Sequence, residues 1–205
     1  MKDRKDGSIK MASSNDLILL VVPHQACSTS TASTIPGAPA KACDLMALPF
    51  AKILQRELTV SKKMSRILIN DGESDCVVDD YQCRSSKWRQ QVSQYYPKIS
   101  LLLDIRSIKL PSDLKFILSV NNEVTMVELP EETVTRSVEL ARQIVDQANQ
   151  SGHHVSLKRG IINDLIDQSL QNKVVSLCIK VNDNISDMST VASLVAETVA
   201  EAVGG

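Results

Sequence analysis

The chain has 205 residues, of which 23% are charged and 43% are apolar, and its formal net charge is −1. This length is enough for one domain with a buried core, and the near-neutral charge argues against nucleic acid as a partner. The longest apolar stretch, LILLVVP at 17–23, is too short to span a bilayer and no cleavage site follows it, so we expect neither a membrane segment nor a signal peptide.

The first fifteen residues are polar and charged and show no periodicity. They are predicted to form a disordered tail, which leaves 16–205 as a single domain. The chain has five cysteines and no paired CxxC spacing, so a reducing, cytoplasmic environment is expected. Because aromatic residues make up only 3%, the core must consist mainly of Val, Ile, Leu and Ala.

Strands are predicted where aliphatic residues follow one another without interruption. Four such runs occupy Leu17–Val22, 66–70, 100–105 and 174–181. Two further β-rich runs, 116–120 and 124–128, flank Asn121-Asn122, a pair that is typical of a hairpin turn.

Helices are predicted between these strands from apolar residues at helical spacing. The expected helices cover 42–58, 84–96, 130–151, 161–170 and a final segment with Val191, Leu194, Val195, Thr198 and Val199 on one face. Pro49 should bend the first helix or delay its start, and Gly152 should end the third. The alternation predicts an α/β fold with a mostly parallel or mixed sheet and helices on both faces, of a phosphorylase/hydrolase-like kind.

In such sheets a functional site lies beyond the carboxyl ends of the strands. His24 follows the first strand, a polar loop at 70–84 follows the second, Arg106 follows the third, and Lys180 lies on the last strand. We therefore expect the functional residues at these positions.

Taken in order, four segments resemble the N-formylglutamate amidohydrolase family, which is related in fold to zinc carboxypeptidases. VVPHQA matches the family's strand followed by Pro-His, and LLLDIRS resembles its apolar strand ending in D-x-H-S. CVVDDYQCRSSKWRQ is similar to its D-x-N-R segment, with Arg84 in the helical part. SLCIKVND is similar to the strand that carries the catalytic glutamate.

The resemblance implies a zinc ion held by two histidines and a carboxylate, and a carboxylate base. His24 is retained, but Arg106 stands at the second histidine position, and arginine cannot ligate a metal. The first acidic residue after His24 is Asp44. Lys180 falls on the position of the base.

The family's amide and guanidinium positions fall on Asp79 and Asp80. A corner that should attract a carboxylate would then repel it. We expect Arg106 and Lys180 to pair with these aspartates where metal and substrate would lie in the enzymes, because buried charges need partners. His24 and Arg84 complete this expected remnant pocket.

The first interpretation is therefore a catalytically inactive relative of the amidohydrolases, without a cofactor. It would serve as a structural or scaffold subunit, with a protein partner or as a homo-oligomer, in the cytoplasm or in an intracellular or viral assembly. One alternative is a zinc-dependent amide hydrolase with an altered ligand set that includes His24 and Asp44. A second is an anion-binding module that uses Arg106 and Lys180.

Several other residues are predicted to have ordinary roles. His153-His154 are expected in a solvated loop after the Gly152 helix end, and Cys178 is expected to be a small core residue. The acidic loop near Asp79 is expected to be solvated. The last helix is expected to pack on the sheet, with docking on a partner as the alternative.

Overall fold

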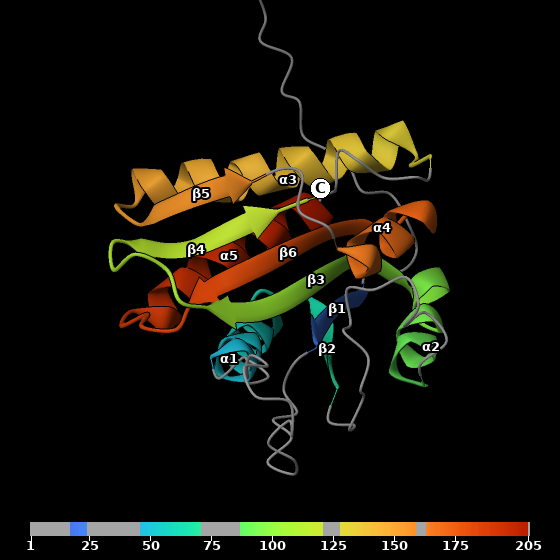
Figure 1. Cartoon of the computed structure of the whole chain (residues 1–205), viewed down its shortest axis with the longest axis horizontal. Coiled ribbons are helices and arrows are strands. Elements are labelled where there is room, and N and C mark those ends of the chain that lie inside the picture. Colours follow the sequence, from blue (N-terminus) through green and yellow to red (C-terminus); the bar gives the residue numbers. More distant parts are fainter. Residues whose placement is uncertain (1–16, 24–45, 71–86, 121–127, 159–162, 205) are drawn as a thin grey trace, which may run out of the picture.

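The computed structural model describes residues 17–23, 46–70, 87–120, 128–158 and 163–204. They form a six-stranded sheet whose strand order is β2-β1-β3-β6-β4-β5 (Figure 1). The strands are β1 (Leu17–Val22), β2 (Met64–Ile69), β3 (Ile99–Ile108), β4 (Leu114–Ser119), β5 (His154–Lys158) and β6 (Val175–Asn182). The predicted α/β fold class, with a mostly parallel sheet, is confirmed.

The direction of the strands divides the sheet into two parts. β2, β1, β3 and β6 run parallel to one another. β4 is antiparallel to β6, and β5 is parallel to β4. The carboxyl ends of the first four strands therefore share one edge of the sheet, whereas β4 and β5 end at the opposite edge.

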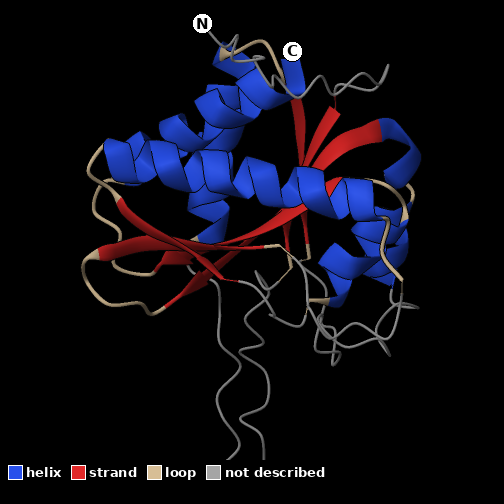
Figure 2. Cartoon of the chain, turned by 90° about the horizontal axis from the view of Figure 1, so that it is seen from above, coloured by secondary structure: helices blue, strands red, loops and turns tan. Residues whose placement is uncertain are grey.

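Helices lie on both sides of the twisted sheet (Figure 2). The core cluster on one side contains residues of α1 (Ala47–Val60), α3 (Glu131–Gln150) and α5 (Met188–Gly204). The cluster on the other side contains residues of α2 (Lys87–Ser93) and α4 (Asp164–Gln171). We call these sides the α1/α3/α5 face and the α2/α4 face.

Strand β3 shows how the sequence divides between the two faces. Its residues alternate in direction, as in any strand. Leu101, Leu103 and Ile105 lie in the core of the α1/α3/α5 face, whereas Leu102 packs on the α2/α4 face. Asp104 and the residue two positions after it share the direction of Leu102 and therefore point toward the α2/α4 face.

The limits of the long helices follow from local sequence. In α1, Pro49 lies in the first turn, where its missing N–H has no helical partner to lose. The helix begins at Ala47, which agrees with the delayed start expected from Pro49. Residues 42–45 lie outside the described part. In α3, Glu131 and Glu132 occupy the first turn, where carboxylates favour the helix dipole.

The end of α3 depends on a glycine. Gly152 follows the helix with φ +81°, a conformation that other residues adopt at a cost. The main-chain N–H of His153 then donates to the carbonyl of Ala148 at 2.9 Å, which closes the end of the helix. The predicted helix end at Gly152 is confirmed.

The final helix packs into the core, as the first reading of its apolar stripe predicted. Val191, Val195 and Val199 are fully buried in the α1/α3/α5 face. Burying a side chain of this size contributes roughly 1.5–3 kcal/mol. Docking of this stripe on a partner is therefore excluded, because the stripe is already covered.

Two predictions about local structure were wrong. β4 is paired with β5 on one side and with β6 on the other, so residues 116–119 are not one arm of a hairpin. Most of the second expected arm, 124–127, lies outside the described residues. The region of His153-His154 is not simply a loop, because His154 begins the edge strand β5.

No helix in the described part of the chain combines the length and the hydropathy needed to cross a membrane.

Candidate functional site

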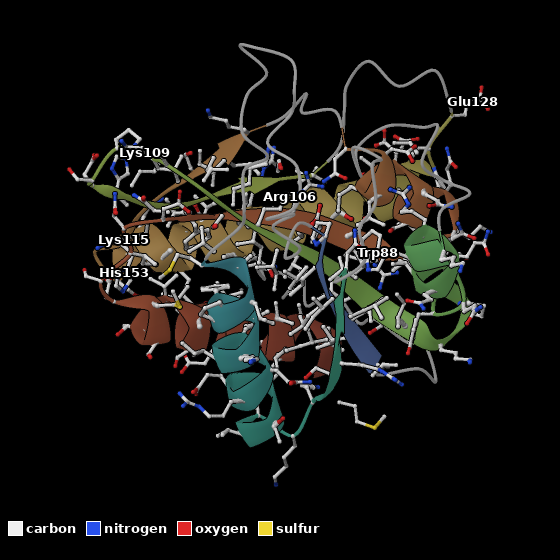
Figure 3. All side chains as sticks on the ribbon, turned by 60° about the horizontal axis from the view of Figure 1, so that its bottom comes forward. Trp88, Arg106, Lys109, Lys115, Glu128 and His153 are labelled. Carbon is white, nitrogen blue, oxygen red and sulfur yellow. The ribbon has the colours of Figure 1, made fainter. Side chains whose placement is uncertain are left out.

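The centre of the candidate site is an ion pair within β3. The Arg106 guanidinium donates from Nε to both Asp104 carboxylate oxygens, at 3.2 and 3.0 Å, and from Nη2 to Oδ2 at 2.8 Å. The two residues are separated by one position, so the strand directs both toward the same face. Asp104 is fully buried and Arg106 is 6% exposed. Figure 3 shows Arg106 over the middle of the sheet.

The amino end of α4 fixes the carboxylate of this pair. Asn163 is the N-cap of α4, and its Oδ1 accepts the main-chain N–H of Ile166 at 3.3 Å. Its side-chain amide donates to Asp104 Oδ2 at 2.7 Å. One asparagine thus starts the helix and ties that helix to the sheet. Arg106 and Asn163 thus both hold the Asp104 carboxylate.

A second buried ion pair lies beside the first and joins α2 to α4. Arg89 Nη2 donates to Asp164 Oδ2 at 2.6 Å and to Gln168 Oε1 at 2.8 Å. Both charged side chains are completely buried. Trp88 lies next to Arg89 on α2 and belongs to the core of the same face (Figure 3). The α2/α4 face therefore contains two desolvated arginine–aspartate pairs.

Lys180 lies next to Arg106 across the sheet. β3 and β6 pair in parallel with Arg106 opposite Lys180. Ile179 and Val181 belong to the core of the α1/α3/α5 face, so Lys180 points toward the α2/α4 face together with Arg106. Lys180 is half-buried. The predicted proximity of these two cations is thus found.

Cys178, one step earlier on β6, shows the electrostatics of this region. Its thiol is fully buried. Burial, and then the negative charge of Asp104, raise the pKa of the Cys178 thiol to about 12, although Arg106 and Lys180 act in the opposite direction. The thiol therefore stays protonated and unreactive at neutral pH, as expected for a core cysteine.

The described residues do not fit a zinc ion at this place. Zinc needs neutral imidazole, thiolate or carboxylate ligands. The carboxyl end of β3 supplies instead a guanidinium, which has only donors, and the Asp104 carboxylate is already engaged by Arg106 and Asn163. Within the described ranges, no three His, Cys, Asp or Glu side chains are placed to hold a metal.

Five of the predicted site residues cannot be placed. They are His24, Asp44, Asp79, Asp80 and Arg84, which all lie outside the described residues. The expected pairing of Arg106 and Lys180 with the aspartates at 79–80 therefore stays a prediction. What the structure adds is a different carboxylate partner for Arg106, on its own strand.

Sequence reasoning missed the roles of four residues in this site. In LLLDIRS, one residue separates Asp104 from Arg106, and this spacing on a strand is a sequence signal for the pair. Asn163 has the residue type of a helix N-cap, which could have been recognised from sequence. The pair of Arg89 with Asp164 joins residues 75 positions apart, and no local pattern indicates it.

A separate cluster of charges lies at the start of α5. The Asp187 carboxylate accepts Lys115 Nζ at 2.9 Å and lies 3.2 Å from His153 Nδ1, and Figure 3 shows Lys115 and His153 close together. Burial raises the pKa of Asp187, but the hydrogen bond from Lys115, a main-chain hydrogen bond and the charges of Lys115 and His153 together outweigh it and hold that pKa below the ordinary 3.8. His153 is therefore not the solvated loop residue that was predicted.

His154 differs from its neighbour in exposure. Its ring Nδ1 lies 2.9 Å from Asp113 Oδ2, with both side chains exposed. The hydrogen bond from His154 holds the pKa of Asp113 below its ordinary value. Exposed pairs of this kind contribute little to stability.

Comparisons with known proteins give structural matches only. No protein-family model matches the sequence, and no curated protein matches it. Among solved structures, the gene product Atu2144 from Agrobacterium tumefaciens matches with a TM-score of 0.53 and 13% identity, over 94% of this chain and 90% of that chain.

Two further solved structures that match are an amidase and an aspartoacylase family protein. The N-acetylmuramyl-L-alanine amidase Ami1 from Mycobacterium smegmatis has a TM-score of 0.50 and 12% identity, over 93% of this chain and 96% of that chain. An aspartoacylase family protein from Mesorhizobium loti has a TM-score of 0.49 and 14% identity, over 91% of this chain and 51% of that chain. The chain thus shares its overall fold with the solved structure of the amidase Ami1.

Proposed function

We propose that this protein is a catalytically inactive relative of the amidohydrolases and that it acts as a structural subunit of a larger assembly. The observation that carries this proposal is the ion pair at the carboxyl end of β3. Arg106 occupies the position that the N-formylglutamate amidohydrolase resemblance assigns to a zinc-binding histidine, and Asp104 and Asn163 support it there.

The physical argument rests on what a buried arginine does to a metal site. Arg106 is positively charged at all relevant pH values and has no lone pair to give. A divalent cation beside it would be repelled in a region where burial strengthens electrostatic interactions. Lys180, in register with Arg106, adds a second positive charge on the same face. A zinc-bound hydroxide mechanism is therefore disfavoured at these strand ends.

The same contacts support a structural role. The pair of Arg89 with Asp164 connects α2 to α4, and the N-cap residue Asn163 connects α4 to Asp104 of β3, which is also paired with Arg106. Removal of one partner from such a pair is strongly unfavourable, because an unpaired buried charge remains. Charges that are tied to one another in this way constrain how the helices and the sheet pack, which supports a subunit whose function depends on its shape.

Two measurements test the absence of catalysis. Purified protein is dialysed against zinc and then against buffer, and its metal content is measured by mass spectrometry. We expect well below one zinc per chain, and no hydrolysis of N-formylglutamate or of a muramoyl-L-alanine amide. One zinc per chain that is lost in His24→Ala, together with turnover that is lost in the same variant, would overturn the proposal.

The structural role needs a separate test. Size-exclusion chromatography of an extract from the native source, followed by immunodetection, gives the apparent mass of the particle that contains the chain. We expect the chain in the extract to elute far above the 22.5 kDa of one chain. Purified protein is run separately, as a control for the elution volume of the isolated chain. Elution as a monomer in both samples would contradict the proposed role in an assembly.

A further inference from the structure

We propose that Lys180 binds the carboxylate of a small ligand at the carboxyl end of β3 and β6, with Arg106 as the neighbouring fixed positive charge. This binding function goes beyond the structural role proposed above and does not depend on it. The observations behind it are the register of the two strands, the charges on the α2/α4 face, and the apolar neighbour of Lys180.

The position of Lys180 suits a ligand-binding group. Adjacent strands lie about 4.8 Å apart, and Arg106 and Lys180 are register partners on the same face. Lys180 lies two residues before the end of β6. Lys180 therefore lies near the edge that four parallel strands share, where ligands of open α/β sheets bind.

The charges near Lys180 do not balance among the described residues. The charge of Arg106 is matched by Asp104, and Arg89 is matched by Asp164. Lys180 has no hydrogen bond or ion pair within the described part of the chain. A half-buried ammonium without a counter-charge is unfavourable, and one additional negative charge would remove the imbalance.

One net positive charge favours a carboxylate over a phosphate dianion. Bound to Lys180, a carboxylate would leave this region neutral, whereas a dianion would leave an excess negative charge close to Asp104. The Asp104 carboxylate is fixed by Arg106 and Asn163 and cannot turn away. Like charges at short range in a partly buried region repel each other, so a singly charged group fits better.

An apolar residue lies on the other side of Lys180. Ile117 of β4 pairs with Lys180 across the antiparallel ladder. Phe116 and Leu118 belong to the core of the α1/α3/α5 face, so Ile117 shares the face of Lys180. Ile117 is 3% exposed, so only the edge of its side chain is open, and a ligand with a carboxylate on Lys180 would have room for only a short carbon chain beside it. Short fatty acids such as propionate have this combination.

The test measures thermal unfolding in sodium propionate against sodium chloride at equal ionic strength. We expect the Tm of the wild-type protein to rise with propionate and to saturate, and phosphate to give a smaller rise. In Lys180→Met the affinity should fall at least about tenfold, because a charge-assisted hydrogen bond is lost. Lys180→Arg should restore most of it. Lys52→Met, on an exposed position of α1, should bind like the wild type.

Three outcomes would overturn the proposal. The first is a rise that does not saturate and is equal in the wild type and Lys180→Met, which would mean a general salt effect. The second is a flat response of the wild type, which would mean that another part of the chain already neutralises Lys180. The third is phosphate binding tighter than propionate. Circular dichroism of Lys180→Met without ligand checks that this variant is folded.

Discussion

The two faces of the sheet are built from different chemistry. The α1/α3/α5 face is an aliphatic core in which β3, β6 and three long helices meet through Leu, Ile, Val and Ala side chains. The α2/α4 face has a smaller apolar core and adds the ion pairs of Arg106 with Asp104 and of Arg89 with Asp164. The same strands contribute to both faces, because alternate residues point in opposite directions.

This difference shows which face of the sheet tolerates substitution and which face is constrained by its charges. An aliphatic face stabilises the fold through area and close packing, and it tolerates small changes of similar volume. A face with buried charges is stable only while each charge keeps its partner. Residues of the α2/α4 face are therefore constrained by their pairs, and Lys180 stands out there as a cation with no partner within the described residues.

The largest expected effect is on the α2/α4 face, at Arg89. Arg89→Met removes the cation from a fully buried pair and leaves Asp164 without it. We expect a loss of about 3–5 kcal/mol in the free energy of unfolding, measured by urea denaturation with circular dichroism.

A double variant separates charge from packing at this position. Arg89→Met with Asp164→Asn removes both charges, and asparagine has nearly the same volume as aspartate. We expect the double variant to be more stable than Arg89→Met alone, because the uncompensated carboxylate is gone. A double variant that is less stable than the single one would mean that packing around Arg89 matters more than its charge.

The next effect is at the strand end that carries the functional proposal. Arg106→His leaves Asp104 with Asn163 as its hydrogen-bond partner, without a permanent cation. We expect a loss of about 2–3 kcal/mol at pH 7.5, where an ordinary histidine is mostly neutral. The difference from the wild type should become smaller near pH 5.5, where histidine is protonated. An unchanged Tm at pH 7.5 would show that the pair is not important for stability.

A matched change on the α1/α3/α5 face should cost less. Ile179 lies one position before Lys180 on β6 and points into the aliphatic core. Ile179→Val removes one methylene and creates a small cavity, so we expect a loss of about 0.5–1.5 kcal/mol. Urea denaturation of this variant and of Arg106→His in the same buffer compares the two faces directly. A loss at Ile179 that exceeds the loss at Arg106 would reverse the comparison.

The strands were predictable to the extent that they are aliphatic on both faces. β1, β3 and β6 were predicted within three residues of their observed ends, because nearly every side chain in them is buried. β5 was missed because HVSLK is an edge strand with exposed polar residues and lacks this signal. The hairpin was predicted wrongly, because Asn121-Asn122 has turn chemistry but β4 pairs with strands distant in sequence.

The site was predictable only where strands determine it. Arg106 and Lys180 were predicted together, because parallel strands bring their carboxyl ends to one edge. The contacts of Arg89 and Asn163 depend on how α2 and α4 pack on the sheet, and that packing is set by tertiary structure. A single sequence contains no local pattern for such contacts.

The smallest expected effect is at the start of α5, away from both buried pairs. Because the pKa of Asp187 lies below the ordinary 3.8, its ionised form stabilises the fold above that pH, and this contribution is lost as pH falls through the lower folded pKa. Lys115→Met should lower stability at pH 7 by a few tenths of a kcal/mol, as is usual for partly exposed pairs.

The pH dependence identifies this contribution. The Tm of Lys115→Met and of the wild type, measured from pH 7 to pH 2, should converge at the acid end, where Asp187 is protonated in both. A constant difference over the whole range would show that Lys115 acts through packing and not through its charge. Lys52→Met provides the control for removal of an exposed lysine.

Because the Cys178 thiol is buried, its reaction rate reports how often β6 separates from the strands beside it. A protonated sulfur in the middle of a paired strand cannot be alkylated until β6 separates from β3 and β4. When Cys27, Cys43, Cys76 and Cys83 are replaced by serine, the rate of iodoacetamide labelling therefore measures the rate of local unfolding at the centre of the sheet. Any ligand or subunit that binds the folded sheet would lower the labelling rate of Cys178, and the decrease would grow with the fraction of protein bound.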